Sequence, residues 1–119
     1  MKFHIVFCPR YRRKIFNIPG VKERFTEIVR QSCAENNIEI LNLECEEDYV
    51  HIFVSICPQT GFAEIMRILK TESGKKLLNE FEELKAMQNL WTRNYFVSTE
   101  ENISSETIRW YVDRQRKRY

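Results

Sequence analysis

Near the end of the sequence, a phenol and a side-chain amide stand one helical turn apart. Tyr111 and Gln115 follow the apolar pattern of Ile108 and Val112, so a helix would carry the phenol and the amide carbonyl on one face. A tyrosine hydroxyl can attack a phosphodiester and hold one side of the broken linkage as a phosphate ester, provided that a divalent cation polarises the phosphate. The pair therefore indicates phosphoryl transfer, although Tyr111 without this context would be interpreted as an aromatic residue that packs on a sheet.

A histidine and a glutamate in the middle of the chain could supply ligands for that cation. Residues 49–56 alternate between aliphatic side chains and a second set that includes His51, and the second set should face away from the helices. In the preceding strand, the same alternation groups Glu44 with Asn42, Ile40 and Ile38. Glu44 and His51 can then be neighbours, and one imidazole with oxygen ligands such as Glu44 and Gln115 suits Mg²⁺ or Mn²⁺. Taken singly, His51 would be interpreted as an ordinary strand histidine, and Glu44 could simply be part of a solvated hairpin turn.

The hydrophobic pattern predicts a sheet and helices that would position these residues. The predicted elements are a strand at 3–8, a helix at 21–33, strands at 38–45 and 49–56, a helix at 62–81, a strand at 91–99 and a helix at about 104–117. This order is that of an α+β, ferredoxin-like or RNA-recognition-like antiparallel sheet, β-α-β-β-α-β, with helices on one face and an additional C-terminal helix. Ser104 is the expected N-cap of that last helix, and Ile103 and Ile108 are placed as a hydrophobic staple.

Composition limits the class of protein. The 119 residues fit one domain with a modest core, and a homodimer is a common way to bury the remaining apolar surface. The four cysteines, at 8, 33, 45 and 57, form no C-x-x-C pair and follow no signal peptide, so we expect buried, reduced thiols. No apolar run approaches the ~20 residues that cross a bilayer. These features predict a soluble, cytoplasmic protein without a membrane segment.

The net charge is only +2, but the charges are clustered. Residues 44–48 are acidic, whereas 10–14 and 114–118 are basic, a distribution that suits a metal together with phosphates. Tyr11 and Phe16 alternate with the first basic cluster, as expected where bases stack and phosphates are neutralised. The candidate nucleic-acid contacts are Arg10, Tyr11, Arg12, Arg13, Lys70, Lys75, Lys76 and Arg93, although any exposed lysine or arginine is such a candidate.

Five segments, in the same order, resemble the HUH-type single-tyrosine transposases of small insertion sequences. They are Phe3-His4-Ile5-Val6-Phe7-Cys8-Pro9-Arg10-Tyr11-Arg12-Arg13, Glu44 with Asp48, Tyr49-Val50-His51, the segment from Arg93 to Thr99, and Tyr111 with Gln115. The resemblance spans nearly all 119 residues. Each motif is weak alone, and their shared order makes coincidence a poor explanation.

The resemblance implies an enzyme that cuts and rejoins single-stranded DNA through a 5′-phosphotyrosine. It makes Tyr111 the nucleophile and His51, Gln115 and Glu44 the residues that hold Mg²⁺ or Mn²⁺. It also implies supporting roles at the metal site for His4, Asp48 and Tyr49. The implied partners are folded single-stranded ends, such as hairpins, and a second copy of the chain in a homodimer that can exchange C-terminal helices.

One position departs from the family pattern. The family motif has histidine at both ends, whereas this chain has Tyr49 at the first position, and a neutral phenol with an ordinary pKa of ~10 is a poor ligand for Mg²⁺. Either Glu44 and water complete a weaker metal centre, or the chain is a nucleic-acid-binding protein, derived from such a transposase, that no longer cuts. A dimeric regulatory domain is a third alternative, and it would lack salt-dependent affinity for single-stranded DNA.

Overall fold

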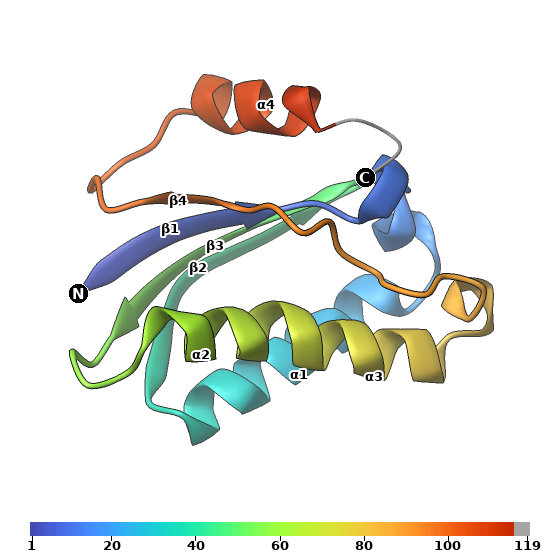
Figure 1. Ribbon diagram of the computed structural model, residues 1–119, viewed down its shortest axis with the longest axis horizontal. Helices are drawn as coiled ribbons and strands as arrows, with labels where there is room; N and C mark the ends of the chain where they lie inside the picture. The colour runs from blue at the N-terminus through green and yellow to red at the C-terminus, as the bar shows by residue number, and fades with distance from the viewer. Residues whose placement is uncertain (116–119) are drawn as a thin grey trace.

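The predicted sheet is present and has four antiparallel strands. The computed structural model describes residues 1–115, and its strands follow the order β2-β3-β1-β4 (Figure 1). The strands are β1 (Lys2–Phe7), β2 (Ile38–Glu46), β3 (Tyr49–Ile56) and β4 (Phe96–Ser98). This order confirms the predicted α+β, ferredoxin-like arrangement.

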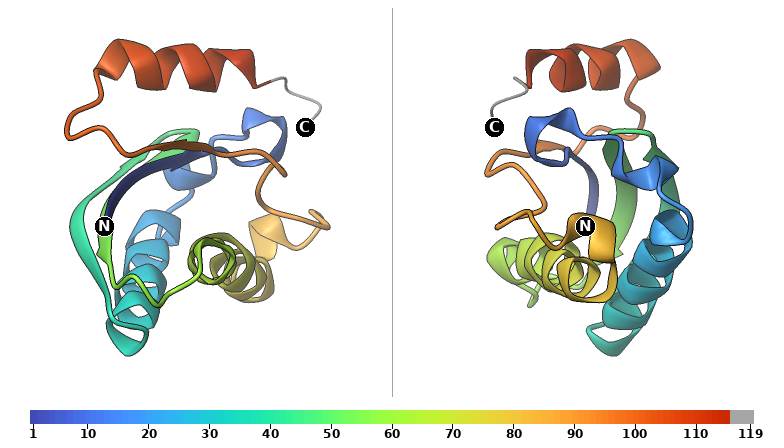
Figure 2. Two further views of the ribbon diagram at one scale, coloured as in Figure 1. Left: turned by 60° about the vertical axis from the view of Figure 1, so that its left-hand side comes forward. Right: turned by 90° about the vertical axis from the view of Figure 1, so that its right-hand side faces the viewer.

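Helices lie on both faces of the sheet, but unequally. α1 (Val21–Glu35) and a second long helix cover one face, and α4 (Ser105–Arg114) lies over the other (Figures 1 and 2). The second long helix consists of α2 (Phe62–Met66), a π-helical segment (Arg67–Glu72) and α3 (Ser73–Glu80). Short 3₁₀ turns occupy Arg10–Arg12, Ile15–Asn17 and Glu82–Leu84. The predicted pair of helices on one face and the separate C-terminal helix are therefore confirmed.

The main hydrophobic core lies between the sheet and the two long helices. Its fully buried side chains include Phe7, Phe25, Ile52 and Leu69. A smaller apolar cluster lies under α4 and contains Val6, Cys8, Ile108, Tyr111 and Val112. Strand β1 contributes to both clusters, which explains why its sequence is apolar almost without interruption.

Gly74 lies inside the long second helix and faces an indole. A Cβ atom at Gly74 would lie 3.3 Å from Cδ1 and 3.4 Å from Nε1 of Trp91. The same indole donates a hydrogen bond to Oγ of Ser73 over 3.2 Å. Gly74 therefore allows the close approach of Trp91, at the cost of a weaker local helix propensity.

Strand β2 contains a bulge that corrects one predicted face. Between Ile40 and Asn42 the pairing with β3 shifts by one residue, so Leu41 is an extra residue in the strand. One extra residue moves all side chains on one side of it to the opposite face. Ile38 and Ile40 therefore pack in the main core, and the prediction that placed them on the same face as Glu44 was wrong.

The fourth strand is shorter than the predicted span 91–99. Trp91 makes an isolated bridge with Pro9, and a proline has no N–H with which to continue the ladder. The main chain then leaves the sheet, because the carbonyls of Thr92 and Asn94 accept hydrogen bonds from the ammonium of Lys70. Regular pairing with β1 resumes only in β4.

Local sequence signals define the start of α4 well. Oγ of Ser104 accepts a hydrogen bond from the backbone N–H of Thr107 over 3.0 Å, and both Ile103 and Ile108 belong to the apolar cluster under the helix. The predicted cap and staple are thus confirmed. The helix ends at Arg114, with Gln115 as its C-cap residue. The rest of the predicted helix, and most of the basic cluster at 114–118, lie outside the described residues.

The cysteines agree with prediction at three positions out of four. Cys8, Cys33 and Cys45 are buried free thiols, whereas Cys57 is exposed, because it follows the last residue of β3 and begins a surface turn. Across residues 1–115, no helix combines the length and the apolar character that crossing a membrane would require.

Candidate active site

Three of the predicted site residues, Glu44, His51 and His4, lie together on the sheet face beneath α4. His51 of β3 pairs with Glu44 of β2 on one side and with Val6 of β1 on the other, and residues paired in this way point to the same face. His4 lies two residues before Val6 and shares that face. The structure therefore brings Glu44 and His51 together as predicted, and it places His4 beside them.

His4 and His51 form a buried pair. Nδ1 of His4 lies 2.9 Å from Nε2 of His51, and Nε2 of His4 lies 3.1 Å from the carbonyl oxygen of Glu101. Both residues are only 6% exposed, and the His4 ring stacks on Phe53 with the ring centroids 3.9 Å apart. His4 thus connects His51 to the loop that precedes α4.

The other ring nitrogen of His51 faces a carboxylate. Nδ1 of His51 lies 3.6 Å from Oε2 of Glu44, yet it has no hydrogen-bond partner. Burial lowers the pKa of His51, while the charge of Glu44 acts in the opposite direction, so the imidazole is neutral at neutral pH. A neutral imidazole nitrogen beside a carboxylate is a suitable pair of ligands for a divalent cation.

Helix α4 buries the predicted nucleophile. Tyr111 packs 5.8 Å from the ring of Phe96, and its buried hydroxyl has no hydrogen-bond partner. Burial raises the pKa of Tyr111 well above its ordinary value, so the phenol is protonated. Gln115 is also buried; its Nε2 donates to the carbonyl oxygen of Tyr111 over 3.4 Å, and its Oε1 has no partner.

Buried polar atoms without partners are concentrated in these residues. The side chains of residues 1–115 contain four such atoms, which are Nε of Arg10, Nδ1 of His51, the hydroxyl of Tyr111 and Oε1 of Gln115. Leaving a buried polar group unpaired costs ~1–3 kcal/mol, and folded proteins pair the large majority of them. Three of the four atoms belong to the predicted nucleophile and metal ligands, which is the pattern expected of groups that meet a ligand.

The residues fit a cation site built from mixed ligands. Among residues 1–115, no three His, Cys, Asp or Glu side chains lie close enough together to hold a metal ion. An amide oxygen is also a ligand for hard divalent cations, and the unpartnered Oε1 of Gln115 is one. The imidazole of His51 and the carboxylate of Glu44 lie close enough together to share one cation, and the amide of Gln115 is of the ligand type that would suit Mg²⁺ or Mn²⁺ if α4 brought it to them.

Asp48 and Tyr49 connect the sheet to α4. Oδ2 of Asp48 accepts from the guanidinium of Arg12 over 3.2 Å, and the same guanidinium lies 3.6 Å from a carboxylate oxygen of Asp113 in α4. The guanidinium of Arg109, also in α4, lies 5.5 Å from the ring centroid of Tyr49. Burial raises the pKa of Tyr49, so its phenol stays neutral and is a weak ligand for a cation.

Sequence reasoning missed the residues that attach α4 to the sheet. Arg109 and Asp113 have the i,i+4 spacing of a helix-surface ion pair, and they form one over 3.3 Å. That spacing alone does not indicate that the pair also reaches Arg12 and Tyr49. Glu101 participates through its main-chain carbonyl, which leaves no signature in the side-chain sequence.

The basic turn after β1 is strained, and only part of it faces solvent. Tyr11 and Arg12 have φ angles of 62° and 49°, in the left-handed region that costs side-chain-bearing residues ~1–3 kcal/mol. Arg12 turns towards Asp48, while Tyr11 is 45% exposed, with the guanidinium of Arg13 at 5.7 Å from its ring centroid. Phe16 is buried in the main core, so the prediction that it stacks on bases was wrong.

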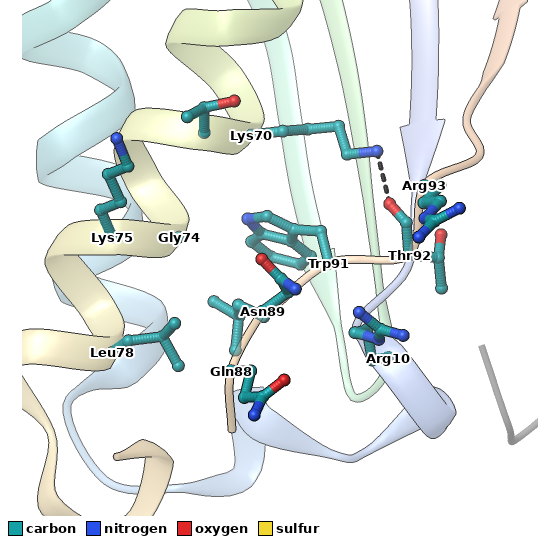
Figure 3. A pocket seen from close by; sticks show the side chains of 12 residues that line it. Arg10, Lys70, Gly74, Lys75, Leu78, Gln88, Asn89, Trp91, Thr92 and Arg93 are labelled. Atoms are coloured by element: carbon teal, nitrogen blue, oxygen red, sulfur yellow. Dashed lines mark hydrogen bonds between the residues drawn. The ribbon is translucent and has the colours of Figure 1, made fainter. Parts of the chain in front are cut away.

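A basic pocket of about 370 Å³ lies between the second long helix and the segment 88–93 (Figure 3). Its lining includes no carboxylate and four cationic side chains, those of Arg10, Lys70, Lys75 and Arg93. Nζ of Lys70 donates to the carbonyl oxygens of Thr92 and Asn94 over 2.6 and 3.2 Å, and burial lowers the pKa of Lys70 to about 8. Lys70 thus holds the main chain that forms one wall of the pocket. An adjoining hollow shares Arg10 and adds Tyr11 and Arg13.

Several known proteins resemble this chain in sequence. Residues 1–115 match the sequence model of the family described as "Transposase IS200 like". Over 102 residues the chain is 37% identical to the transposase for insertion sequence element IS200 of Salmonella typhimurium, an alignment that covers 82% of this chain and 66% of the relative. The chain thus spans slightly less than two thirds of the length of that protein. It is also 25% identical over 118 residues to the ISDra2 transposase TnpA of Deinococcus radiodurans, covering 97% and 84% of the two chains.

Solved structures show the same fold. The crystal structure of a proposed transposase from Deinococcus radiodurans R1 superimposes with a TM-score of 0.84 at 26% identity, covering 98% of this chain and 91% of the other. The structure of a REP-associated tyrosine transposase bound to a REP hairpin shares the fold at a TM-score of 0.61 and 13% identity, covering 96% and 63% of the chains. The family match over residues 1–115, together with the shared fold, shows that the chain belongs to the IS200-like transposase family.

Proposed function

We propose that this protein is a metal-dependent DNA transposase that cuts and rejoins single-stranded DNA through a 5′-phosphotyrosine at Tyr111. The observation that carries the proposal is the concentration of unpartnered buried atoms on the hydroxyl of Tyr111, Nδ1 of His51 and Oε1 of Gln115. A nucleophile and two ligands of a site that binds phosphate and metal have this property before their ligands arrive. Membership in the transposase family supports the reaction class.

In the proposed reaction, the hydroxyl oxygen of Tyr111 attacks a phosphorus atom of the strand. The new bond joins that oxygen to phosphorus and the bond from phosphorus to the 3′-oxygen breaks. The phenolic proton is transferred to a base or to water, and the leaving 3′-oxygen takes up a proton to become a hydroxyl. Mg²⁺ or Mn²⁺, held by His51, Glu44 and Gln115, would polarise the phosphate. Rejoining is the reverse attack by a 3′-hydroxyl on the phosphotyrosine, so no nucleotide cofactor is needed.

Access to Tyr111 requires that α4 move or be exchanged. The hydroxyl of Tyr111 is buried in this arrangement, and α4 is attached to the sheet through a small apolar cluster and the side chains of Arg109 and Asp113. Such an attachment can open more readily than the main core. We propose a homodimer in which α4 of one subunit can serve the metal site of the other.

The basic pocket and the adjoining turn are the proposed DNA contacts. Arg10, Arg13, Lys75 and Arg93 supply the positive charge and Tyr11 an exposed ring, a combination that suits the backbone and bases of single strands. Lys70 contributes indirectly, because it holds the main chain at Thr92 and Asn94. Arg12 contributes by its contact with Asp113 of α4. Hairpin-containing single-stranded ends are the proposed substrate, in keeping with a structural relative that was solved bound to a REP hairpin.

The test is a covalent adduct assay. The protein is incubated with a hairpin-containing single-stranded oligonucleotide, with Mn²⁺ or with EDTA, and the products are separated under denaturing conditions. We expect a protein–DNA adduct with Mn²⁺ and none with EDTA, because the phosphate is not polarised without the cation. An absence of adduct, together with DNA binding, would favour a catalytically silent DNA-binding protein, the alternative that Tyr49 suggests. An absence of both would reject the proposal.

Two adjacent lysines allow a matched test of the basic pocket. Lys75 lines the pocket, whereas its exposed neighbour Lys76 does not. Lys75→Ala should weaken binding of the hairpin strand by roughly 3- to 10-fold and reduce the slope of log K against log salt by ~0.7, the share of one phosphate contact. Lys76→Ala should change neither value. Fluorescence anisotropy over a salt series measures both, and equal effects of the two substitutions would remove the pocket from the DNA-binding surface.

A further inference from the structure

We infer that His4 is a positioning residue for the metal site: it holds the proton of His51 on Nε2 and so leaves Nδ1 of His51 free to bind the cation. The first step rests on the partners of His4. A main-chain carbonyl can only accept a hydrogen bond, so Nε2 of His4, 3.1 Å from the carbonyl oxygen of Glu101, must donate. In a neutral imidazole the other nitrogen is then an acceptor.

The second step transfers this assignment to His51. When His4 is neutral, its Nδ1 accepts; this atom lies 2.9 Å from Nε2 of His51, so Nε2 of His51 then carries the proton. Nδ1 of His51 therefore has a lone pair, and it is this atom that lies 3.6 Å from Oε2 of Glu44 without a hydrogen bond. Two acceptors that face each other at this distance repel unless a cation or a proton lies between them. A cation bound between Nδ1 of His51 and the carboxylate of Glu44 would therefore remove this repulsion.

The third step concerns how firmly His4 is held. The ring is buried and stacks on Phe53 with an interplanar angle of 4°, and His4 is directly paired with Phe53 in the register of β1 and β3. Its outer hydrogen bond ends on Glu101, between β4 and α4. His4 therefore sets both the tautomer and the orientation of His51 from the centre of the sheet, the role that outer partners of metal-binding histidines commonly have.

This inference rests on the proposed metal site and names a residue that controls it. Two substitutions of similar size separate positioning from packing. In His4→Asn, the amide oxygen stands near the former place of Nδ1 and can still accept from His51. In His4→Leu, an apolar side chain of comparable volume has no acceptor. Both lose the stacked ring and the contact with Glu101, so they differ mainly in the acceptor.

The first measurement is the tautomer of His51 in the metal-free protein, read from the long-range ¹⁵N–¹H correlation of its imidazole ring at neutral pH. We expect protonated Nε2 in the wild-type protein and in His4→Asn. In His4→Leu the proton should move to Nδ1, where it can be donated to Glu44. A wild-type protein with the proton on Nδ1, or no difference between the two variants, would overturn the inference.

The second measurement is Mn²⁺ affinity, by titration calorimetry or by the loss of the free-ion electron paramagnetic resonance signal. Loss of an outer partner commonly weakens metal binding by 10- to 100-fold, so His4→Leu should bind Mn²⁺ about 10- to 100-fold more weakly, and His4→Asn within about threefold of the wild type. Equal losses in both variants would indicate packing alone and overturn the role of His4 while leaving the metal site. A wild-type protein that does not bind Mn²⁺ would reject the metal site itself and, with it, this role.

Discussion

Replacement of Tyr111 by phenylalanine is expected to abolish the covalent adduct with single-stranded DNA, a loss of ~10³-fold or more, because no other atom then forms the ester. The same substitution should leave the midpoint of thermal unfolding unchanged or raise it. The hydroxyl is buried without a hydrogen-bond partner, and its removal relieves a cost of ~1–3 kcal/mol. Denaturing electrophoresis measures the adduct, and thermal unfolding by circular dichroism measures the stability.

The matched control is Tyr95→Phe. Tyr95 is 41% exposed and packs against Phe62, so the control also removes a tyrosine hydroxyl, but one outside the apolar cluster under α4. Adduct formation should be unaffected. If Tyr111→Phe still forms the adduct, or if Tyr95→Phe loses it, another residue is the nucleophile. A large drop in the unfolding temperature of Tyr111→Phe would show that its hydroxyl has a partner that this arrangement of α4 does not reveal.

The second large predicted effect is a gain in metal affinity. Tyr49→His should strengthen Mn²⁺ binding by ~10- to 100-fold, the size of effect that metal-site residues commonly have. Position 49 is two residues from His51 on the same strand, so the new imidazole points to the same face and adds a nitrogen where the present phenol is neutral and weakly ligating. The adduct should also form at lower Mn²⁺ concentrations. Calorimetric titration and the dependence of adduct yield on Mn²⁺ are the two measurements.

Tyr49→Phe is the control for that experiment, because it keeps the ring under Arg109 and removes only the hydroxyl. Mn²⁺ affinity should stay at the wild-type level. A clear loss of affinity in Tyr49→Phe would identify the phenol as a ligand and contradict the mixed-ligand site. No gain in Tyr49→His would mean that position 49 does not reach the cation, and that Glu44 and Gln115 already determine its geometry.

The sequence predicted the fold and the neighbourhood of Glu44 and His51 because both depend on regular alternation. β3 alternates strictly and pairs in register with β1, so the face of His51 could be inferred from residues alone. The bulge at Leu41 could not, since no glycine or other local signal accompanies it. Residues before the bulge were therefore assigned to the wrong face, whereas Glu44, after it, was assigned correctly.

Other features depend on contacts between distant segments. The burial of Lys70 follows from the carbonyls of Thr92 and Asn94, more than twenty residues further along the chain, and a lysine in a helix gives no indication of this. The contact of His4 with Glu101 uses a main-chain atom, which is the same in every residue. The attachment of α4 requires Arg12, Asp48 and Asp113 to meet, and only the assembled fold brings them together.

The extra residue in β2 also determines how this strand can change length. Without Leu41, the residues of β2 would alternate regularly between the two faces of the sheet. The face towards the main core carries Ile38, Ile40, Leu43 and Cys45, and the opposite face carries Glu39, Asn42, Glu44 and Glu46. A deletion at position 41 would therefore keep every other side chain on its present side and mainly straighten the strand. Deletion of Leu43 would instead move side chains to the opposite face of the sheet. Either the residues before the deletion would change face, or Glu44 and the residues after it would, and the carboxylate would then turn away from the imidazole of His51. The strand can thus lose a residue at position 41 during evolution without disturbing the pairing of the Glu44 carboxylate with the His51 imidazole, on which a bound cation would depend.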